Sequence, residues 1–180
     1  RSGLAPDRYL AAPSDTSGVA IGSTTDKDAA LRLRFEKTTS GIAELDAKLA
    51  WIRDNKIGTD GDVLRRSFDY VVNNYVYRSG SLYPSGDWAP PFALEMINNG
   101  GGNCYHFAAL FCVLAQSYGY DATVISGSVP SLSGGWVPHG WVEVRLNGTV
   151  YVCDPDLAYE IRGYNWFMIT YGQAPTTYKK

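Results

Sequence analysis

The stretch that decides the fold is GGGNCYHFAALFCVLAQSYG, residues 100–119, in which a cysteine separates a glycine run from an apolar run. The apolar residues after Cys104 recur at helical spacing, and Asn103 is of a type that caps helices, so we predict a buried central helix that begins at Cys104. A thiolate there is stabilised by free N–H groups and by the helix dipole, and the glycines would let a substrate approach the backbone closely. This setting suits a nucleophile, but for a cysteine taken alone a small packed apolar residue is the favoured interpretation, because buried unreactive cysteines are common.

A thiol nucleophile needs a base within hydrogen-bond reach, and the base needs a group that orients it. The sequence holds two histidines, His106 and His139. On a helix, residues two positions apart point roughly 200° away from each other, so His106 cannot face Cys104 and is expected to pack or to cap the helix. His139 is therefore the candidate base.

His139 begins the strand pattern HGWVEVRL, which an Asn-Gly pair joins to the pattern TVYVC. Asn-Gly is the signal of a two-residue hairpin turn, so Leu146 is expected opposite Thr149. Alternate residues of a strand share a face, and in this register Asp154 becomes a diagonal neighbour of His139. A carboxylate in that place can accept the imidazole N–H, so we predict that Asp154 orients His139.

Asp156 is the alternative carboxylate, because the same register places it directly opposite His139. Pro155 cannot donate to a strand ladder, so pairing is expected to end before Asp156, and this favours Asp154. A register slipped by one residue would turn Asp154 to the other face, so the prediction depends on the turn type. Trp141 shares the face of His139 in this register.

The order of the predicted elements indicates the fold class. Apolar residues recur at helical spacing in three segments before the central helix, and three alternating segments follow it. This order predicts a single α+β domain in which N-terminal helices and the central helix pack on an antiparallel β-sheet. The expected helix starts are Ser40, Thr59 or Asp60, and Pro91, and the expected strands are 122–129, 139–146 and 149–153.

Residues 1–40 differ from the rest of the chain in composition. They mix Gly, Ser, Thr, Asp and Ala, with one alternating stretch at Leu31, Leu33 and Phe35. We predict an N-terminal arm over 1–40 that ends in a strand, and one main domain over 41–180. The arm either covers a substrate site or packs against the domain, and we favour packing.

Composition excludes several classes of function. The 180 residues are 45% hydrophobic, enough for one domain with a core. With 16 Lys and Arg against 18 Asp and Glu there is no basic stripe, so we expect no nucleic-acid partner. No apolar run reaches the roughly 20 residues of a membrane span, and no signal peptide is seen. A high aromatic content (13%) with few charged residues (19%) resembles a secreted bacterial domain, so we expect a secreted or cell-surface location.

The cysteines argue against a disulfide framework. Their number, three, is odd, and Cys112 and Cys153 lie in apolar segments where a small hydrophobic residue would serve equally well. Neither the acidic cluster of a calcium site nor the ligand spacing of a zinc site is visible. We therefore expect no metal and no cofactor.

Three separated motifs together resemble the transglutaminase-like superfamily, in its bacterial minimal-core form with a papain-like fold. They are Gly102-Asn103-Cys104, His139-Gly140-Trp141-Val142-Glu143 and Asp154-Pro155. In that family a Gly-x-Cys opens the central helix, a His-x-Trp-x-Glu strand supplies the base, and an Asp at the end of the next strand completes the triad. The resemblance covers about residues 42–160.

The resemblance implies a cysteine enzyme that acts on protein or peptide amide bonds through a thioester. Cys104 would be the nucleophile, His139 the general base and acid, and Asp154 the orienting carboxylate. The backbone N–H of Cys104 and the indole N–H of Trp88 are candidates for the oxyanion hole. Aromatic candidates for the substrate groove are Tyr83, Trp136 and Trp141.

Several alternatives stay open at this point. Attack of water on the thioester would make the protein a peptidase or amidase, whereas attack of an amine would make it an acyltransferase, and the triad serves both. An arylamide or other small-molecule acyltransferase would use the same residues. A protein- or carbohydrate-binding module that retains the fold without catalysis is the alternative outside enzymes. Substrate identity and oligomeric state stay open.

Overall fold

The computed structural model describes part of the N-terminal segment and nearly all of the remaining chain. The chain divides into two compact units, 1–37 and 38–180. In the first unit, β1 (Tyr9–Ala11) and β2 (Gly22–Thr24) form an antiparallel pair. The strand expected around Leu31 lies outside the described residues. The described ranges are 9–11, 22–24, 39–80 and 84–180.

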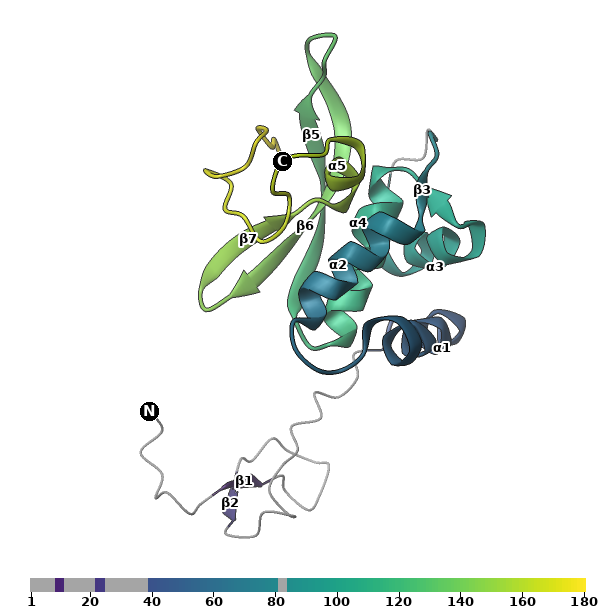
Figure 1. The fold of residues 1–180 in the computed structure, drawn as a ribbon, viewed down its shortest axis with the longest axis vertical. Helices are drawn as coiled ribbons and strands as arrows, with labels where there is room; N and C mark the ends of the chain where they lie inside the picture. The colour runs from purple at the N-terminus through teal and green to yellow at the C-terminus, as the bar shows by residue number, and fades with distance from the viewer. Residues whose placement is uncertain (1–8, 12–21, 25–38, 81–83) are drawn as a thin grey trace. The chain divides into compact units, whose positions relative to one another are not determined.

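The second unit is an α+β domain, as predicted. Its three-stranded antiparallel sheet has the order β5-β6-β7, and α4 lies against β5 and β6 with α2 and α3 packed on α4 (Figure 1). No helix among the described residues is long and apolar enough to cross a membrane. The helices are α1 (Ala43–Ile52), the π-helical turn η1 (Arg53–Ile57), α2 (Val63–Asn74), α3 (Ala89–Asn99), α4 (Cys104–Ser117) and α5 (Pro155–Glu160). The strands are β3 (Val76–Tyr77), β4 (Gly101–Gly102), β5 (Asp121–Pro130), β6 (Trp136–Leu146) and β7 (Thr149–Cys153).

Helix α4 is the core of the domain, and it begins at Cys104 as predicted. Every residue of α4 except Gln116 is buried, because sheet and helices enclose it on all sides. Phe111, which is fully buried, meets Phe68 of α2 edge to face at 5.4 Å. Burial of side chains of this size stabilises a domain by about 2–3 kcal/mol each, so the first turn of α4 is held rigidly.

A capping box fixes the start of α4. The side chain of Asn103 accepts a hydrogen bond from the N–H of Tyr105 at 3.1 Å, and the N–H of Asn103 donates to Nδ1 of His106 at 3.3 Å. Nε2 of His106 lies 3.1 Å from Glu95 of α3. The predictions that Asn103 caps the helix and that His106 caps or packs are confirmed.

Two glycines of the run are needed for packing within the chain, and the predicted close approach of a substrate to this run stays a prediction. Gly101 and Gly102 form β4, which pairs in parallel with β3. A Cβ atom at Gly101 would lie 2.2 Å from the carbonyl oxygen of Val76, and one at Gly102 would lie 2.4 Å from the ring of His106. Glycine is therefore required at both positions by neighbouring atoms of the same domain.

The hairpin of β6 and β7 has the predicted register. Asn147 and Gly148 both have positive φ, 50° and 79°, as a type I′ turn requires. Leu146 pairs with Thr149, and the ladder ends at the pair Val142 and Cys153. Beyond it the chain leaves β6, and the N–H of Asp154 donates to the carbonyl of Trp166.

The segment after α5 covers the sheet face that carries Trp141, whereas the adjacent Val142 faces α4 in the main core. This segment forms isolated bridges at Ile169 with β7 and at Lys179 with β5. In Figure 1 it runs beside β6 and β7 as the yellow trace. Neither α5 nor this cover was predicted.

The helix starts differ from the predicted ones by a few residues. Helix α1 has Ile42 as its N-cap, and Ser40 accepts a hydrogen bond from the N–H of Ile42 instead of capping the helix. Helix α2 is capped by Asp62, whose side chain accepts from the N–H of Arg65, and not by Thr59 or Asp60. Helix α3 begins at Ala89, two residues before the expected Pro91. Several polar residues near each start are able to cap, and the side chain that reaches the free N–H groups decides between them.

Candidate active site

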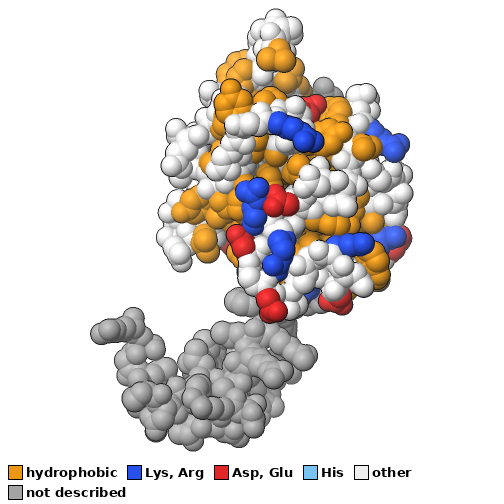
Figure 2. All heavy atoms as spheres, viewed as in Figure 1, with side chains coloured by type: hydrophobic (Ala, Val, Ile, Leu, Met, Phe, Trp, Pro, Cys, Tyr) orange, Lys and Arg blue, Asp and Glu red, His pale blue; other side chains and the backbone are white. Residues whose placement is uncertain are grey.

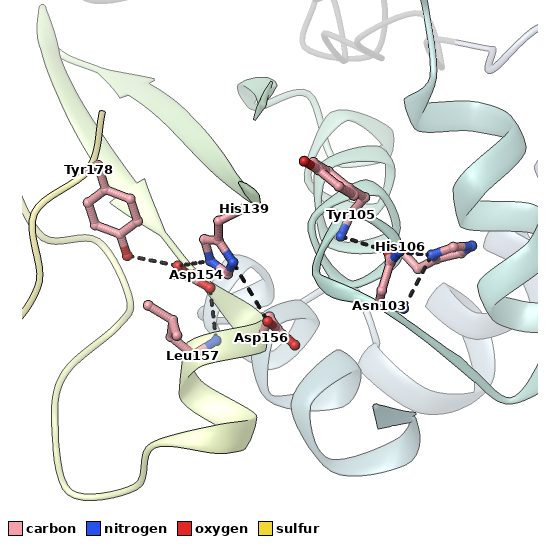
Figure 3. A network of polar contacts seen from close by, with 8 residues as sticks. All are labelled: Asn103, Tyr105, His106, His139, Asp154, Asp156, Leu157 and Tyr178. Carbon is pink, nitrogen blue, oxygen red and sulfur yellow. Dashed lines mark hydrogen bonds and ion pairs between the residues drawn. The ribbon is translucent and has the colours of Figure 1, made fainter. Parts of the chain in front are cut away.

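The base and its carboxylate meet where β6 and β7 diverge. Nε2 of His139 lies 2.8 Å from Oδ2 of Asp154, and both side chains are buried. Because a carboxylate only accepts, the proton of this bond lies on Nε2, which leaves Nδ1 for another partner. The structure thus brings together the two residues that the hairpin register predicted to be neighbours (Figure 3).

Two further donors hold Asp154 in place. Asp154 is the N-cap of α5, and its Oδ1 accepts from the N–H of Leu157 at 2.9 Å. The hydroxyl of Tyr178, from the segment after α5, donates to Oδ2 at 2.8 Å. With His139 these are three donors to a carboxylate that is 0% exposed, which is the support that a buried charge needs.

Cys104 lies on the helix side of the same site. Its sulfur, a ring nitrogen of His139 and a carboxylate oxygen of Asp156 all lie within 4.8 Å of one another. Since Nε2 of His139 is engaged by Asp154, Nδ1 is the nitrogen available to the thiol. Cys104 is 8% exposed, and no histidine is seen on the face drawn in Figure 2, in agreement with the burial of both histidines.

Electrostatics favour a charged imidazole. Burial acts to lower the pKa of His139, but the charge of Asp154 and its hydrogen bond raise it, as do the hydrogen bond and charge of Cys104. The net effect places the pKa of His139 well above its ordinary value of 6.5. An imidazolium beside Cys104 stabilises a thiolate, which is the reactive form of cysteine.

Asp156, the alternative carboxylate, lies near the site without a hydrogen bond to His139. Its Oδ2 is 3.9 Å from Nδ1 of His139, beyond hydrogen-bond distance, and its Oδ1 has no hydrogen-bond partner among the described residues. Burial and the charge of Asp154 raise the pKa of Asp156 from 3.8 to about 8, although the charge of His139 acts in the opposite direction. Asp156 is therefore a second buried carboxyl group at the site, beside the thiol.

Tyr77 is a site residue that sequence reasoning missed. It lies in β3, which pairs in parallel with Gly101 and Gly102 just before the start of α4. Burial raises the pKa of Tyr77, and so do the charges of Asp156, Cys104 and Glu160. Its side chain is 38% exposed.

The aromatic residues proposed for a substrate groove lie in different places. Trp141 is fully buried, stacks on His139 and donates its N–H to Tyr171, so it supports the site from within and does not line a groove. Trp136 is 48% exposed, at the start of β6. Tyr83 lies outside the described residues.

Trp88, the predicted oxyanion donor, is buried at the N-cap of α3. Its ring meets the ring of Tyr105 edge to face, with centroids 5.6 Å apart. Trp88 thus packs on the residue that follows Cys104. This position keeps it as a candidate for the oxyanion hole.

The other two cysteines lie apart from this chemistry. All three cysteines are free, and burial raises the pKa of both Cys112 and Cys153 to about 12. Thiols in such surroundings are unreactive at neutral pH. Cys112 therefore offers an internal comparison for the reactivity of Cys104.

A family model described as the transglutaminase-like superfamily matches residues 50–168 of the chain. This range holds the capped start of α4, the hairpin and α5. A search of curated proteins found no match.

Solved structures with a related fold are remote in sequence. The chain is similar to a proposed cysteine protease from Cytophaga hutchinsonii, with 19% identity over 73% of this chain and 39% of that one and a TM-score of 0.47. It is also similar to the periplasmic domain of TgpA from Pseudomonas aeruginosa, with 17% identity over 66% of this chain and 45% of that one and a TM-score of 0.42. An arylamine N-acetyltransferase from Mycobacterium abscessus matches with 27% identity over 63% of this chain and 42% of that one, at a TM-score of 0.37. The chain spans less than half the length of each of these structures.

Proposed function

The chain belongs to the transglutaminase-like superfamily, and we propose that it is a cysteine enzyme that acts on protein or peptide amide bonds through Cys104, His139 and Asp154. One observation carries the proposal. A buried chain of groups runs from the thiol at the start of α4, through the imidazole, to a carboxylate held by Leu157 and Tyr178. Nucleophile, base and orienting group in this order are what thiol-based acyl transfer requires.

In the first step the thiolate of Cys104 attacks the carbonyl carbon of the amide. The oxygen becomes negative and needs donors, for which the N–H of Cys104 is available because the first N–H groups of a helix have no intrahelical acceptor. The indole N–H of Trp88 is the second candidate, since its ring packs beside Tyr105.

In the second step His139 gives its Nδ1 proton to the nitrogen of the departing amine. The C–N bond breaks, the amine leaves neutral, and the acyl group stays on Cys104 as a thioester. Asp154 keeps the proton on Nε2 throughout, so that Nδ1 always faces the reaction.

The thioester then reacts with water or with an amine, and His139 removes a proton from the nucleophile. Water gives a carboxylic acid, which is the outcome of a peptidase or amidase, and a primary amine gives a new amide, which is acyl transfer. The groups that activate Cys104 are the same for both outcomes. We therefore propose the shared first half of the reaction and leave the acceptor to measurement.

Selective alkylation tests whether Cys104 is activated. The expected result is that iodoacetamide modifies Cys104 well below pH 8, while Cys112 in the same sample is not modified because burial raises its pKa to about 12. His139→Ala should remove the reactivity of Cys104 while circular dichroism shows a folded chain. Equal, slow modification of both cysteines would contradict the enzyme and favour a binding module that retains the fold.

Mass spectrometry of a glutamine-containing protein separates the two outcomes of the thioester. The protein is incubated with the enzyme with and without a primary amine. Incorporation of the amine without chain cleavage indicates acyl transfer and excludes the peptidase. Cleavage, or conversion of side-chain amides to acids, in both samples indicates hydrolysis.

We also propose that the protein works outside the cytoplasm of a bacterium. The support is compositional, since aromatic residues are many (13%) and charged residues few (19%). Fractionation of the source cells with an antibody to the chain tests this location. Recovery of the chain in the cytoplasmic fraction alone would contradict it.

A further inference from the structure

Three side chains of the site present a sulfur, a nitrogen and an oxygen to one common point. These are the sulfur of Cys104, the free ring nitrogen of His139 and a carboxylate oxygen of Asp156, all within 4.8 Å of one another. We propose that they form a binding site for a thiophilic divalent cation of the Zn²⁺ type, and that the bound cation switches the thiol off.

The ligand set suits this class of cation. Thiolate and imidazole are the ligands that Zn²⁺ takes most readily, and one carboxylate completes a common three-ligand set with an open fourth position. Bond lengths of about 2.0–2.3 Å to Zn²⁺ imply ligand atoms roughly 3.5 Å apart. Since Nδ1 of His139 and Oδ2 of Asp156 are 3.9 Å apart, small side-chain shifts would complete the geometry.

His139 is already oriented as a metal ligand. A histidine that binds a metal through one nitrogen usually donates the N–H of its other nitrogen to a carboxylate, which fixes the tautomer. Here Nε2 donates to Asp154 at 2.8 Å, so Nδ1 faces the thiol and Asp156 and offers its lone pair once its proton has left. The bond that prepares His139 as a base therefore also prepares it as a ligand.

Asp156 supplies a second, independent observation. It is 2% exposed, and its Oδ1 has no hydrogen-bond partner among the described residues, unlike the fully supported Asp154. A buried carboxyl group with an unpartnered oxygen is costly, and native structures normally satisfy such atoms. Asp154 already accepts the hydrogen bond of His139, and a cation beside Asp156 would give its carboxyl group a partner.

Metal binding and catalysis would exclude each other. The cation takes the electron pair of the Cys104 sulfur that would attack a carbonyl, and it takes the lone pair of His139 that would accept a proton. Binding releases the proton that Cys104 and His139 hold between them, so affinity rises with pH. The inhibitory consequence rests on the proposed function, but the binding site itself does not.

The whole chain, freed of metal by a chelator that is then removed, is titrated with Co²⁺ as a spectroscopic probe. The expected result is one thiolate-to-cobalt charge-transfer band in the near ultraviolet that saturates at one equivalent and that Zn²⁺ abolishes. The band should be absent in Cys104→Ser. Zn²⁺ should also slow the alkylation of Cys104 in the unmutated chain, and a chelator should restore it.

A matched pair of variants tests the third ligand. Asp156→Asn keeps the size of the side chain and should weaken Zn²⁺ binding about tenfold or more in competition with a chromophoric chelator. Asp121→Asn makes the same change at an exposed position at the start of β5 and should leave the affinity unaltered. Equal affinity in Asp156→Asn and the unmutated chain overturns the proposal.

The remaining outcomes separate this proposal from the proposed function. A folded chain that shows no cobalt band, or whose Cys104 is alkylated equally fast with and without Zn²⁺, overturns the metal site even if Asp156→Asn does not fold. The rate of Cys104 alkylation in the presence of a chelator tests the proposed enzyme without the metal site. A cobalt band with an unreactive thiol would keep the metal site and remove the enzyme, and a reactive thiol without a band would do the reverse.

Discussion

Tyr178 hydrogen-bonds the same oxygen of Asp154 that contacts His139, and both distances are 2.8 Å. One acceptor atom therefore joins the segment after α5 to the candidate base. The ring of Tyr178 also packs against Trp141, with centroids 4.8 Å apart, so ring and hydroxyl contribute separately to the site. This separation allows the hydroxyl to be tested alone.

Tyr178→Phe should slow the alkylation of Cys104 while leaving the fold intact. It removes one hydrogen bond to Asp154, worth about 0.5–1.5 kcal/mol, so the expected loss of rate is roughly 2- to 10-fold at fixed pH. Tyr171→Phe is the matched control, because its hydroxyl donates to Glu143 and not to Asp154. A similar loss of rate in both variants would show that general stability, and not the support of Asp154, is being measured.

Asp154→Asn should be far more damaging to Cys104 reactivity than Asp156→Asn. The amide cannot hold the proton on Nε2 of His139 as a carboxylate does, and we expect a loss of about 100-fold in alkylation rate. Asp156 makes no hydrogen bond to His139, since 3.9 Å separates them, so its replacement should have a much smaller effect. Rates measured on both variants in chelator decide the point, and the reverse order would make Asp156 the orienting carboxylate.

Glu143 should contribute stability that is lost on acidification. Burial acts to raise the pKa of Glu143, but hydrogen bonds from Lys180 and Tyr171 and the charges of Lys180 and Arg145 lower it below its ordinary value of 4.5. Because the folded pKa is depressed, the stabilisation is present above pH 4.5 and disappears as pH falls through the lower folded value.

The variant Glu143→Gln tests this pH dependence. Urea unfolding should show a clear loss of stability against the unmutated chain at pH 7, and the difference should shrink near pH 3. Glu44→Gln serves as the control, because Glu44 is exposed and its partners, Lys48 at 3.6 Å and Asn98 at 3.5 Å, lie at the surface. A difference that stays constant from pH 7 to pH 3 would contradict the assigned role.

Gly101→Ala should destabilise the domain. The new Cβ would lie 2.2 Å from the backbone oxygen of Val76, which cannot move without breaking the pairing of β3 and β4. Overpacking of this kind costs about 1–3 kcal/mol, measurable by thermal or urea unfolding. Gly172→Ala is the control, since nothing lies within 4 Å of a Cβ there, and equal stability of the two variants would refute the packing role of Gly101.

Local sequence chemistry was sufficient to predict the pairing of His139 with Asp154. Asn147 and Gly148 form the turn that their residue types favour, and a two-residue turn leaves one register for the strands that it joins. The central helix could also be predicted from the sequence, because the helical spacing of its apolar residues and the cap at Asn103 indicate the same start. These features depend on residues that are close together along the chain, so they can be read from a single sequence.

The missed residues depend on contacts between distant segments. Tyr178 reaches Asp154 from a segment without helical or strand periodicity, and Tyr77 is placed by a short parallel pairing of β3 with β4. The unpartnered oxygen of Asp156 became visible only once α5 and the helix side of the site were in place. No periodic pattern or turn signal encodes such contacts, because they depend on which surfaces meet after the chain has folded.

The bridges of the segment after α5 also bear on how the domain avoids self-association. In the order β5-β6-β7 the outer strands are the two edges of the sheet, and this one segment bonds β7 at Val152 and β5 at Ser128. Unpaired strand edges are templates on which other chains can add strands and aggregate. At both points a segment of the same domain pairs with the edge strand. A chain cleaved before Ile169 would therefore lose the Tyr178 hydroxyl that supports Asp154. It would also expose both edges of its sheet to other copies of itself.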